Sequence, residues 1–261
     1  MQILIAVAAL GGIGLVLGLL LAAASKYLSV EKDEKAPLIE SVLPGANCGG
    51  CGYAGCAALA EAIARGEAPV DACPVGGNET SREIAEIMGV AAPDVLENVA
   101  TVVCSGDHSS VAKKYEYDSD VDCKTASTLA GGDKKCRHGC LGLGDCMDVC
   151  AFGAISVKNG VANIDPEKCT ACTACIDACP KGIIRLVPKK KSYIVRCSSQ
   201  SPGPDMKGIC TVGCIACRIC EKECPEGAIQ ISDNLAKIDY SKCTDCGECF
   251  QKCPKKIIKK K

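Results

Sequence analysis

The sequence is poor in aromatic side chains. Its 261 residues include no Trp, two Phe and six Tyr, which excludes a large core built on aromatic rings. What the chain has in quantity is cysteine, with 24 residues. We expect metal clusters to stabilise the fold in place of the missing core.

A secreted disulfide scaffold is the alternative use of an even number of cysteines. Such scaffolds are usually short and follow a cleaved signal peptide. Here the first apolar run, residues 3–24, has no basic residue before it and is longer than the apolar part of a signal peptide. The sequence therefore favours metal ligation over disulfides.

The same apolar run predicts a transmembrane helix. Its 22 residues carry no charge and, at about 1.5 Å per residue, cross a hydrocarbon core of roughly 30 Å. Lys26, Lys32 and Lys35 follow the run and no Lys or Arg precedes it. This asymmetry predicts a single pass through the cell (inner) membrane, with the cluster domains on the cytoplasmic side. The spacing of Gly14 and Gly18 favours packing on a helix of another membrane subunit.

Two cysteine runs, at residues 169–180 and 243–254, share the spacing C-x2-C-x2-C-x3-C-P. This is the spacing of bacterial ferredoxins, in which three thiolates bind one [4Fe-4S] cluster and the fourth binds a neighbouring cluster. Each run therefore needs a partner run, and the chain supplies one at residues 140–150 and one at 214–225. The pattern predicts electron transfer through two dicluster ferredoxin modules.

An internal repeat of 74 residues supports this organisation. Nine cysteines from Cys123 to Cys179 recur from Cys197 to Cys253, which indicates a duplication. In the first copy, Asn159-Gly160 between two short apolar segments favours a type I′ hairpin. The predicted fold class is α+β, with an N-terminal transmembrane helix, a small helical [4Fe-4S] domain and two tandem dicluster ferredoxin modules. The expected boundaries are the membrane helix at 1–26, a linker at 27–45, the helical domain at 46–100, a connecting segment at 101–135, the first module at 136–190, a connector at 191–209 and the second module at 210–261.

The helical domain is predicted to hold one [4Fe-4S] cluster. Its four candidate ligands are Cys48, Cys51, Cys56 and Cys73. Glycines between the first three let the backbone fold tightly over a cluster. Zinc is the alternative, because four thiolates also form structural zinc sites.

The ferredoxin ligand rule predicts four further clusters. Their expected ligand sets are Cys136, Cys140, Cys146 and Cys179; Cys150, Cys169, Cys172 and Cys175; Cys214, Cys217, Cys220 and Cys253; and Cys224, Cys243, Cys246 and Cys249. Cys136 enters the first set because Leu143 stands where the repeat would place the counterpart of Cys217. The four remaining cysteines are assigned either to a sixth cluster or to free or structural thiols; they are Cys104, Cys123, Cys197 and Cys210.

Charge is divided unevenly along the chain. Residues 1–135 hold 10 basic and 18 acidic groups, a balance of −8, and residues 136–261 hold 20 and 13, a balance of +7. A basic half is suited to docking an acidic carrier protein. The candidate docking residues are Lys189, Lys190 and Lys191 and, in the tail, Lys255, Lys256, Lys259, Lys260 and Lys261. A solvated lysine surface with a disordered tail is the alternative.

Three features in sequence order resemble one protein family. They are the N-terminal apolar run, the segment Cys48-Gly-Gly-Cys51-Gly-Tyr-Ala-Gly-Cys56 and the segment Cys136-Arg-His-Gly-Cys140-Leu-Gly-Leu-Gly-Asp-Cys146. Over essentially its whole length the chain resembles the B subunit of the Rnf complex, a membrane-bound ferredoxin:NAD+ oxidoreductase that couples electron flow to sodium or proton transport. It departs from the short form of that family in having two dicluster modules.

The resemblance implies a polyferredoxin subunit of an ion-translocating oxidoreductase. It would accept electrons from soluble ferredoxin or flavodoxin and relay them through its clusters to flavin-containing partner subunits, with no nucleic acid involved. No NAD- or flavin-binding motif is visible, so catalysis is expected in other membrane and flavoprotein subunits. Two alternatives remain at this stage, a polyferredoxin of another membrane redox enzyme and a membrane-tethered interaction module stabilised by metal.

Overall fold

The computed structural model describes residues 11–12, 14–23, 34–93 and 96–261. Residues 3–10, 13 and 24 of the predicted membrane helix, and the lysines at 26 and 32, lie outside this part of the chain. Residues 11–12 and 14–23 are helical and exposed. Within the described ranges, no helix is both long enough and apolar enough to cross a membrane.

Three helices form the helical domain, α2 (Lys35–Val42), α3 (Cys56–Ala64) and α4 (Gly77–Met88). Ile39, Leu59, Ile63 and Ile84 pack together in its core, because they recur at helical spacing on the inner faces. Helix α2 lies within the segment 27–45 that was predicted to be a linker. Helix α4 stops where Gly89 adopts a left-handed conformation with φ of 72°.

The first ferredoxin module contains two antiparallel strand pairs. The inner hairpin joins β2 (Ile155–Lys158) to β3 (Val161–Ile164). Its turn residues Asn159 and Gly160 both have positive φ, 48° and 74°, so the predicted type I′ hairpin is confirmed. The second pair joins β1 (Asn98–Val102) to β4 (Ile184–Pro188). Residues 98–102, which span the predicted boundary between the helical domain and the connecting segment, thus supply a strand of this module. The helices of the module are α5 (Cys123–Thr128), α6 (Asp145–Asp148) and α7 (Ala174–Asp177).

The second module repeats this plan. Its hairpin joins β6 (Ile229–Ser232) to β7 (Leu235–Ile238), and β5 (Tyr193–Val195) pairs with β8 (Ile258–Lys260). Its helices are α8 (Gly203–Ile209), α9 (Ile219–Lys222) and α10 (Glu248–Lys252). Lys259 and Lys260 of the C-terminal tail therefore belong to a strand.

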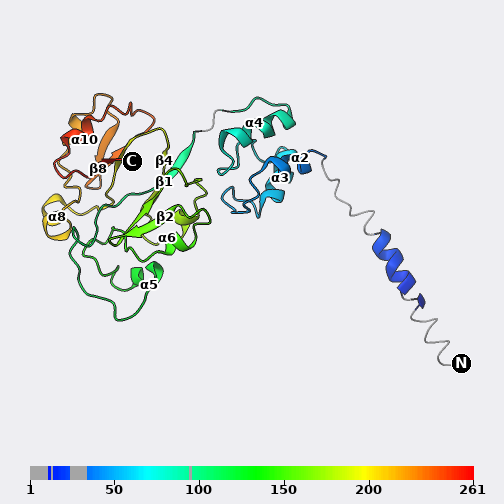
Figure 1. Ribbon diagram of the computed structural model, residues 1–261, viewed down its shortest axis with the longest axis horizontal. Helices are drawn as coiled ribbons and strands as arrows, with labels where there is room; N and C mark the ends of the chain where they lie inside the picture. Colours follow the sequence, from blue (N-terminus) through cyan, green and yellow to red (C-terminus); the bar gives the residue numbers. More distant parts are fainter. Residues whose placement is uncertain (1–10, 13, 24–33, 94–95) are drawn as a thin grey trace.

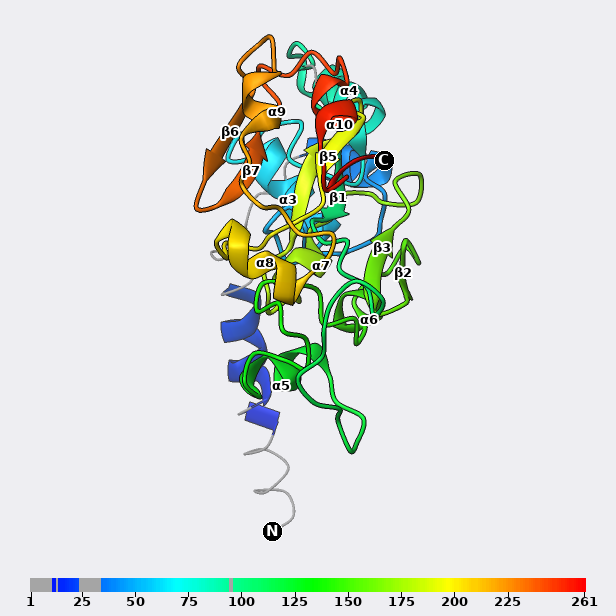
Figure 2. The ribbon, with the colours of Figure 1, turned by 90° about the vertical axis from the view of Figure 1, so that its left-hand side faces the viewer.

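Figure 1 shows α2, α3 and α4 gathered toward the N-terminal helix and the two modules on the other side, with β1 leading from one part to the other. Figure 2 shows the second-module elements β6, β7 and α9 on the side of the molecule opposite β2 and β3. Cysteines are part of both module cores. Cys140, Cys146 and Cys175 pack with Ile155 and Val161, and equivalent cysteines pack with β6 and β7.

Candidate metal centres

All 24 cysteines are free thiols, which argues against the disulfide alternative. Twenty of them line five cavities, four to each cavity. We name these sets group A (Cys48, Cys51, Cys56, Cys73), group B (Cys150, Cys169, Cys172, Cys175), group C (Cys123, Cys140, Cys146, Cys179), group D (Cys104, Cys136, Cys197, Cys210) and group F (Cys224, Cys243, Cys246, Cys249). Group E is the remaining set, Cys214, Cys217, Cys220 and Cys253; burial, and then the neighbouring thiols Cys214, Cys253 and Cys217, raise the pKa of Cys220.

Groups A, B, E and F bring together the cysteines that the spacing grouped. Groups C and D do not. Cys136, which the sequence assigned to the set around Cys140, lies in group D, and Cys123 lines the cavity of group C in its place. The four cysteines left over by the ligand rule are therefore divided between two groups, three in group D and one in group C.

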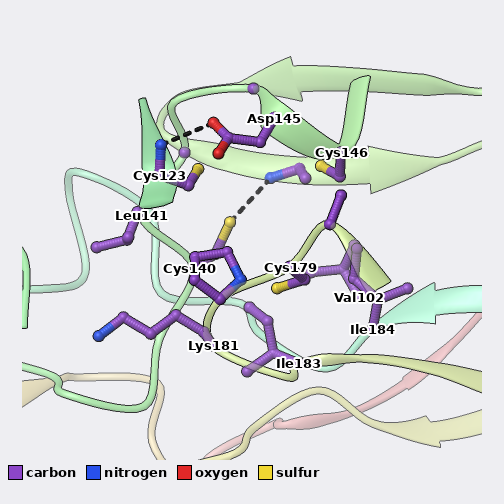
Figure 3. Close-up of a pocket in the computed structure, with 15 residues that line it drawn as sticks. Val102, Cys123, Cys140, Leu141, Asp145, Cys146, Cys179, Lys181, Ile183 and Ile184 are labelled. Atoms are coloured by element: carbon purple, nitrogen blue, oxygen red, sulfur yellow. Dashed lines mark hydrogen bonds between the residues drawn. The ribbon is translucent and has the colours of Figure 1, made fainter. Parts of the chain in front are cut away.

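Asp145 explains why Cys123 reaches group C. Its carboxylate accepts hydrogen bonds from the backbone N–H of Cys123 at 2.7 Å, drawn in Figure 3, and of Lys124 at 3.1 Å. Asp122 fixes the same turn from the other side, because its side chain accepts from Thr125 N at 2.6 Å and caps α5. In the second copy of the repeat, Ile219 stands at the position equivalent to Asp145. The acidic residue at this position of the first copy is the sequence signal that could have identified Cys123.

One cysteine of each ferredoxin run stands two residues after a residue in the left-handed region. Gly144, Thr173, Arg218 and Gly247 have φ of 106°, 68°, 59° and 85°, and each caps the short helix that carries the cysteine. Such a conformation costs of order 1–3 kcal/mol for a non-glycine residue and is found mostly where function requires it. The turn directs the thiol of Cys146, Cys175, Cys220 or Cys249 toward its group.

Backbone N–H groups donate to several cysteine sulfurs. Ala162 donates to Cys140 Sγ at 3.5 Å, a contact drawn in Figure 3, and Ala100 donates to Cys169 Sγ at 3.4 Å. In the second module Ala228 donates to Cys224 Sγ at 3.3 Å. Hydrogen bonds of this kind stabilise thiolates and tune the potential of a bound cluster.

The thiols are buried next to one another, which disfavours their charged form. Burial, and then the neighbouring thiols Cys140 and Cys123, raise the pKa of Cys146 to about 12. Burial, and then Cys214 and Cys253, do the same for Cys220. A bound metal must therefore displace the protons and compensate the charge of the thiolates.

The donor set fits iron–sulfur clusters. Four thiolates surround each cavity, and the Thr170 hydroxyl, which lines the cavity of group B, is buried without a hydrogen-bond partner. Such a donor is suited to a cluster sulfide. Among the described residues, no three His, Cys, Asp or Glu side chains are arranged as they would be around a single metal ion.

Part of the basic docking set is engaged within the chain. Lys189 pairs with Glu167 at 3.5 Å, Lys191 donates to the carbonyl oxygen of Cys243, and Lys261 donates to the carbonyl oxygen of Pro188 at 2.7 Å. Lys259 and Lys260 are exposed.

Comparison with protein-family models identifies the same cysteine-rich segments. A model described as a putative Fe-S cluster matches residues 43–75, and models described as a 4Fe-4S dicluster domain match residues 135–183 and 213–258.

Several relatives match nearly the whole chain. The B subunit of the Na+-translocating ferredoxin:NAD+ oxidoreductase complex of Acetobacterium woodii is 48% identical over 98% of this chain and 77% of that protein. The B subunit of an ion-translocating oxidoreductase complex of Methanosarcina acetivorans is 42% identical over 97% of this chain and 96% of its own length. The B subunit of the proton-translocating ferredoxin:NAD+ oxidoreductase complex of Clostridium ljungdahlii is 40% identical over 95% of this chain and 88% of its own length.

Proposed function

Because this chain belongs to the family of B subunits of ion-translocating oxidoreductase complexes, we propose that it relays electrons, one cysteine group to the next, within a ferredoxin:NAD+ oxidoreductase. It is an iron–sulfur electron-transfer subunit of that complex. The family membership does not fix the coupling ion, because relatives from a Na+-translocating and from a proton-translocating complex both match this chain.

The contact between the helical domain and the first module carries this proposal. A Cβ atom on Gly50 would come within 2.6 Å of the carbonyl oxygen of Cys172. The loop of group A therefore lies directly against the loop of group B. Groups B and C share one core through Cys175 and Cys146, and groups E and F share another through Cys220 and Cys249. Adjacent groups are what a relay requires.

Groups A, B, C, E and F would each hold one [4Fe-4S] cluster, which supplies one-electron redox chemistry when bound. In group C, Cys123 takes the role that the spacing alone gave to Cys136. The chain's own residues would hold each cluster through thiolates, donate backbone N–H groups to the sulfurs and shield the inner cysteines from water. These three factors set the potential at each group.

Electron entry and exit extend the proposal. Reduced ferredoxin or flavodoxin would dock on the second module, whose exposed Lys259 and Lys260 suit an acidic surface. Group A would then pass electrons to flavin-containing partner subunits, and residues 1–26 would anchor the chain in the cell membrane with the clusters on the cytoplasmic side. The relatives' names favour this assignment over a polyferredoxin of another membrane enzyme.

The test is performed on the complex purified anaerobically. We expect acid-labile sulfide in a one-to-one ratio with iron in this subunit, and ferredoxin-dependent NAD+ reduction that is lost when Cys172→Ser and Cys175→Ser are combined. Zinc without sulfide would instead support a metal-stabilised interaction module. Full activity in the double variant would remove group B from the electron path.

A further inference from the structure

The structure assigns a further [4Fe-4S] cluster to group D, and we propose that this cluster connects the two ferredoxin modules electronically. This inference rests on the proposed function, since it supplies the step between groups C and E. The four ligands would be Cys104, Cys136, Cys197 and Cys210.

Group D takes its ligands from both modules. Cys104 lies two residues beyond β1, and Cys197 lies two residues beyond β5. These strands are equivalent, because each pairs with the last strand of its own module. Cys136 lies just before the first ferredoxin run, and Cys210 caps α8 at the entry to the second. A bridge between Val111 and Cys210 ties the segment that precedes Cys136 to the entry of the second module. The group is thus built at the junction of the modules.

Two glycines keep space open among the sulfurs. A Cβ on Gly139 would lie 3.4 Å from Cys136 Sγ and 3.7 Å from Cys104 Sγ. A Cβ on Gly106 would lie 3.5 Å from Cys210 Sγ and 3.7 Å from Cys104 Sγ. Cys104, Cys136 and Cys210 are only 6–8% exposed. The thiols therefore enclose a cavity that stays open because glycine occupies positions 106 and 139. A larger side chain at either position would fill it.

Buried cationic groups lie beside this cavity. Arg196 precedes Cys197, and its Nε is buried without a hydrogen-bond partner. Lys134 is 2% exposed and donates to the carbonyl oxygen of Gly106 at 3.1 Å. The backbone N–H of Gly106 in turn donates to Cys104 Sγ at 3.4 Å. A cluster ligated by four thiolates is anionic, so a positive charge with an unused donor is suited to it.

The sulfurs of group D contact a ligand in each module. The backbone N–H of Cys140 in group C donates to Cys104 Sγ at 3.4 Å. The backbone N–H of Cys214 in group E donates to Cys197 Sγ, also at 3.4 Å. One peptide group therefore separates group D from each neighbour. With a cluster in group D, groups A to F form one continuous series.

A double-variant design tests the assignment on the full chain, reconstituted anaerobically. The native chain is expected to hold about 24 iron and 24 sulfide, four of each per cluster. Cys197→Ser and Cys136→Ser should each lose about four iron and four sulfide. The double variant should lose no more than either single variant, because both thiols would bind the same cluster. Cys123→Ser combined with Cys197→Ser should lose about eight, because those thiols belong to different groups.

Three results would overturn the assignment. About 20 iron in the native chain, unchanged by Cys197→Ser, would make these cysteines structural thiols. Loss of about eight iron in Cys136→Ser with Cys197→Ser would return Cys136 to the set around Cys140. One zinc per chain, lost in Cys197→Ser, would make group D a zinc site. None of these results removes the relay function of the other groups, whereas absence of sulfide from the native chain contradicts the proposed function itself.

A second variant, Gly139→Val, tests the location of the cluster without removing a ligand. It is needed in case the serine variants fail to fold. It keeps all four thiols and fills the space between Cys136 and Cys104. We expect it to lose the same electron paramagnetic resonance signal as Cys197→Ser and no other. Retention of that signal would contradict the location of the cluster.

Discussion

The ammonium group of Lys134 lies 2.6 Å from the carbonyl oxygen of Gly160. Gly160 is in the β2–β3 turn, and the same ammonium also binds Gly106 beside group D. The lysine is almost completely buried and lowers the pKa of Cys140 through its charge, although burial of that thiol raises its pKa more strongly. A single cation thus serves groups C and D together.

Lys134→Met should lower the reduction potentials of the clusters in groups C and D, since a nearby positive charge favours the reduced, more negative state. It should also destabilise the fold by about 1–3 kcal/mol, because two buried carbonyl groups lose their donor. A redox titration followed by electron paramagnetic resonance measures the first effect. The exposed Lys135 provides the control Lys135→Met, and equal potentials in both variants would show that the buried charge has no such role.

Gly50→Ala should interrupt transfer between groups A and B. The added methyl group would meet the Cys172 carbonyl and push the helical domain away from the first module. We expect iron and sulfide to stay at the native level while reduction of group A slows several-fold in rapid-mixing experiments. Gly208→Ala is the matched control, because nothing lies within 4 Å of a Cβ at that position. If both variants transfer electrons at the native rate, the loop contact is not the path.

Asp145→Ala should release Cys123 from group C. Two backbone N–H groups lose their acceptor, which costs about 1–3 kcal/mol where such groups are shielded from water. Iron analysis should show partial loss of one cluster, and thermal unfolding should occur at a lower temperature. Asp148→Ala, at an exposed position on the same helix, should leave both unchanged. Full iron content in Asp145→Ala would mean that the cluster itself holds Cys123 in place.

The hairpins and four of the six cysteine groups follow from local sequence, for a physical reason. Asn159-Gly160 sets a turn, and cysteines separated by two residues meet around one cluster. The exchange of Cys123 and Cys136 could not be predicted in this way. It depends on Asp145, a side chain 22 residues beyond the cysteine that it positions, and on space left by Gly139.

The strands β1 and β5 were missed because neither is recognisable alone. Asn98 in β1 pairs with Pro188 in β4, and so a segment expected to end the helical domain and begin the connector is stabilised by contacts far along the chain. The likeness of residues 102–105 to 195–198 was visible in the sequence. Only the tertiary structure shows why the two segments are alike: each leads out of one of two equivalent strands and presents a cysteine to group D.

The exposed lysines of β8 should govern docking of an acidic electron donor. Lys259→Gln with Lys260→Gln should slow oxidation of reduced ferredoxin at low salt, with a smaller effect at high salt, where charges are screened. The exposed Lys158 of the first module provides the control Lys158→Gln. An unchanged rate at low salt would exclude β8 from the docking surface.

Lys191 calls for a separate comparison. It donates to the Cys243 carbonyl of group F, so Lys191→Gln should alter the signal of that cluster at any salt concentration. A purely salt-dependent effect would instead make Lys191 a docking residue.

The most direct measurement is the visible spectrum of the purified full-length chain, loaded with clusters, mixed anaerobically with reduced ferredoxin. The relay account predicts that the iron–sulfur absorption bleaches as ferredoxin is oxidised, and that less of it bleaches when Cys104→Ser and Cys197→Ser separate the modules. An unchanged spectrum in the native chain, with its iron and sulfide present, would contradict the account.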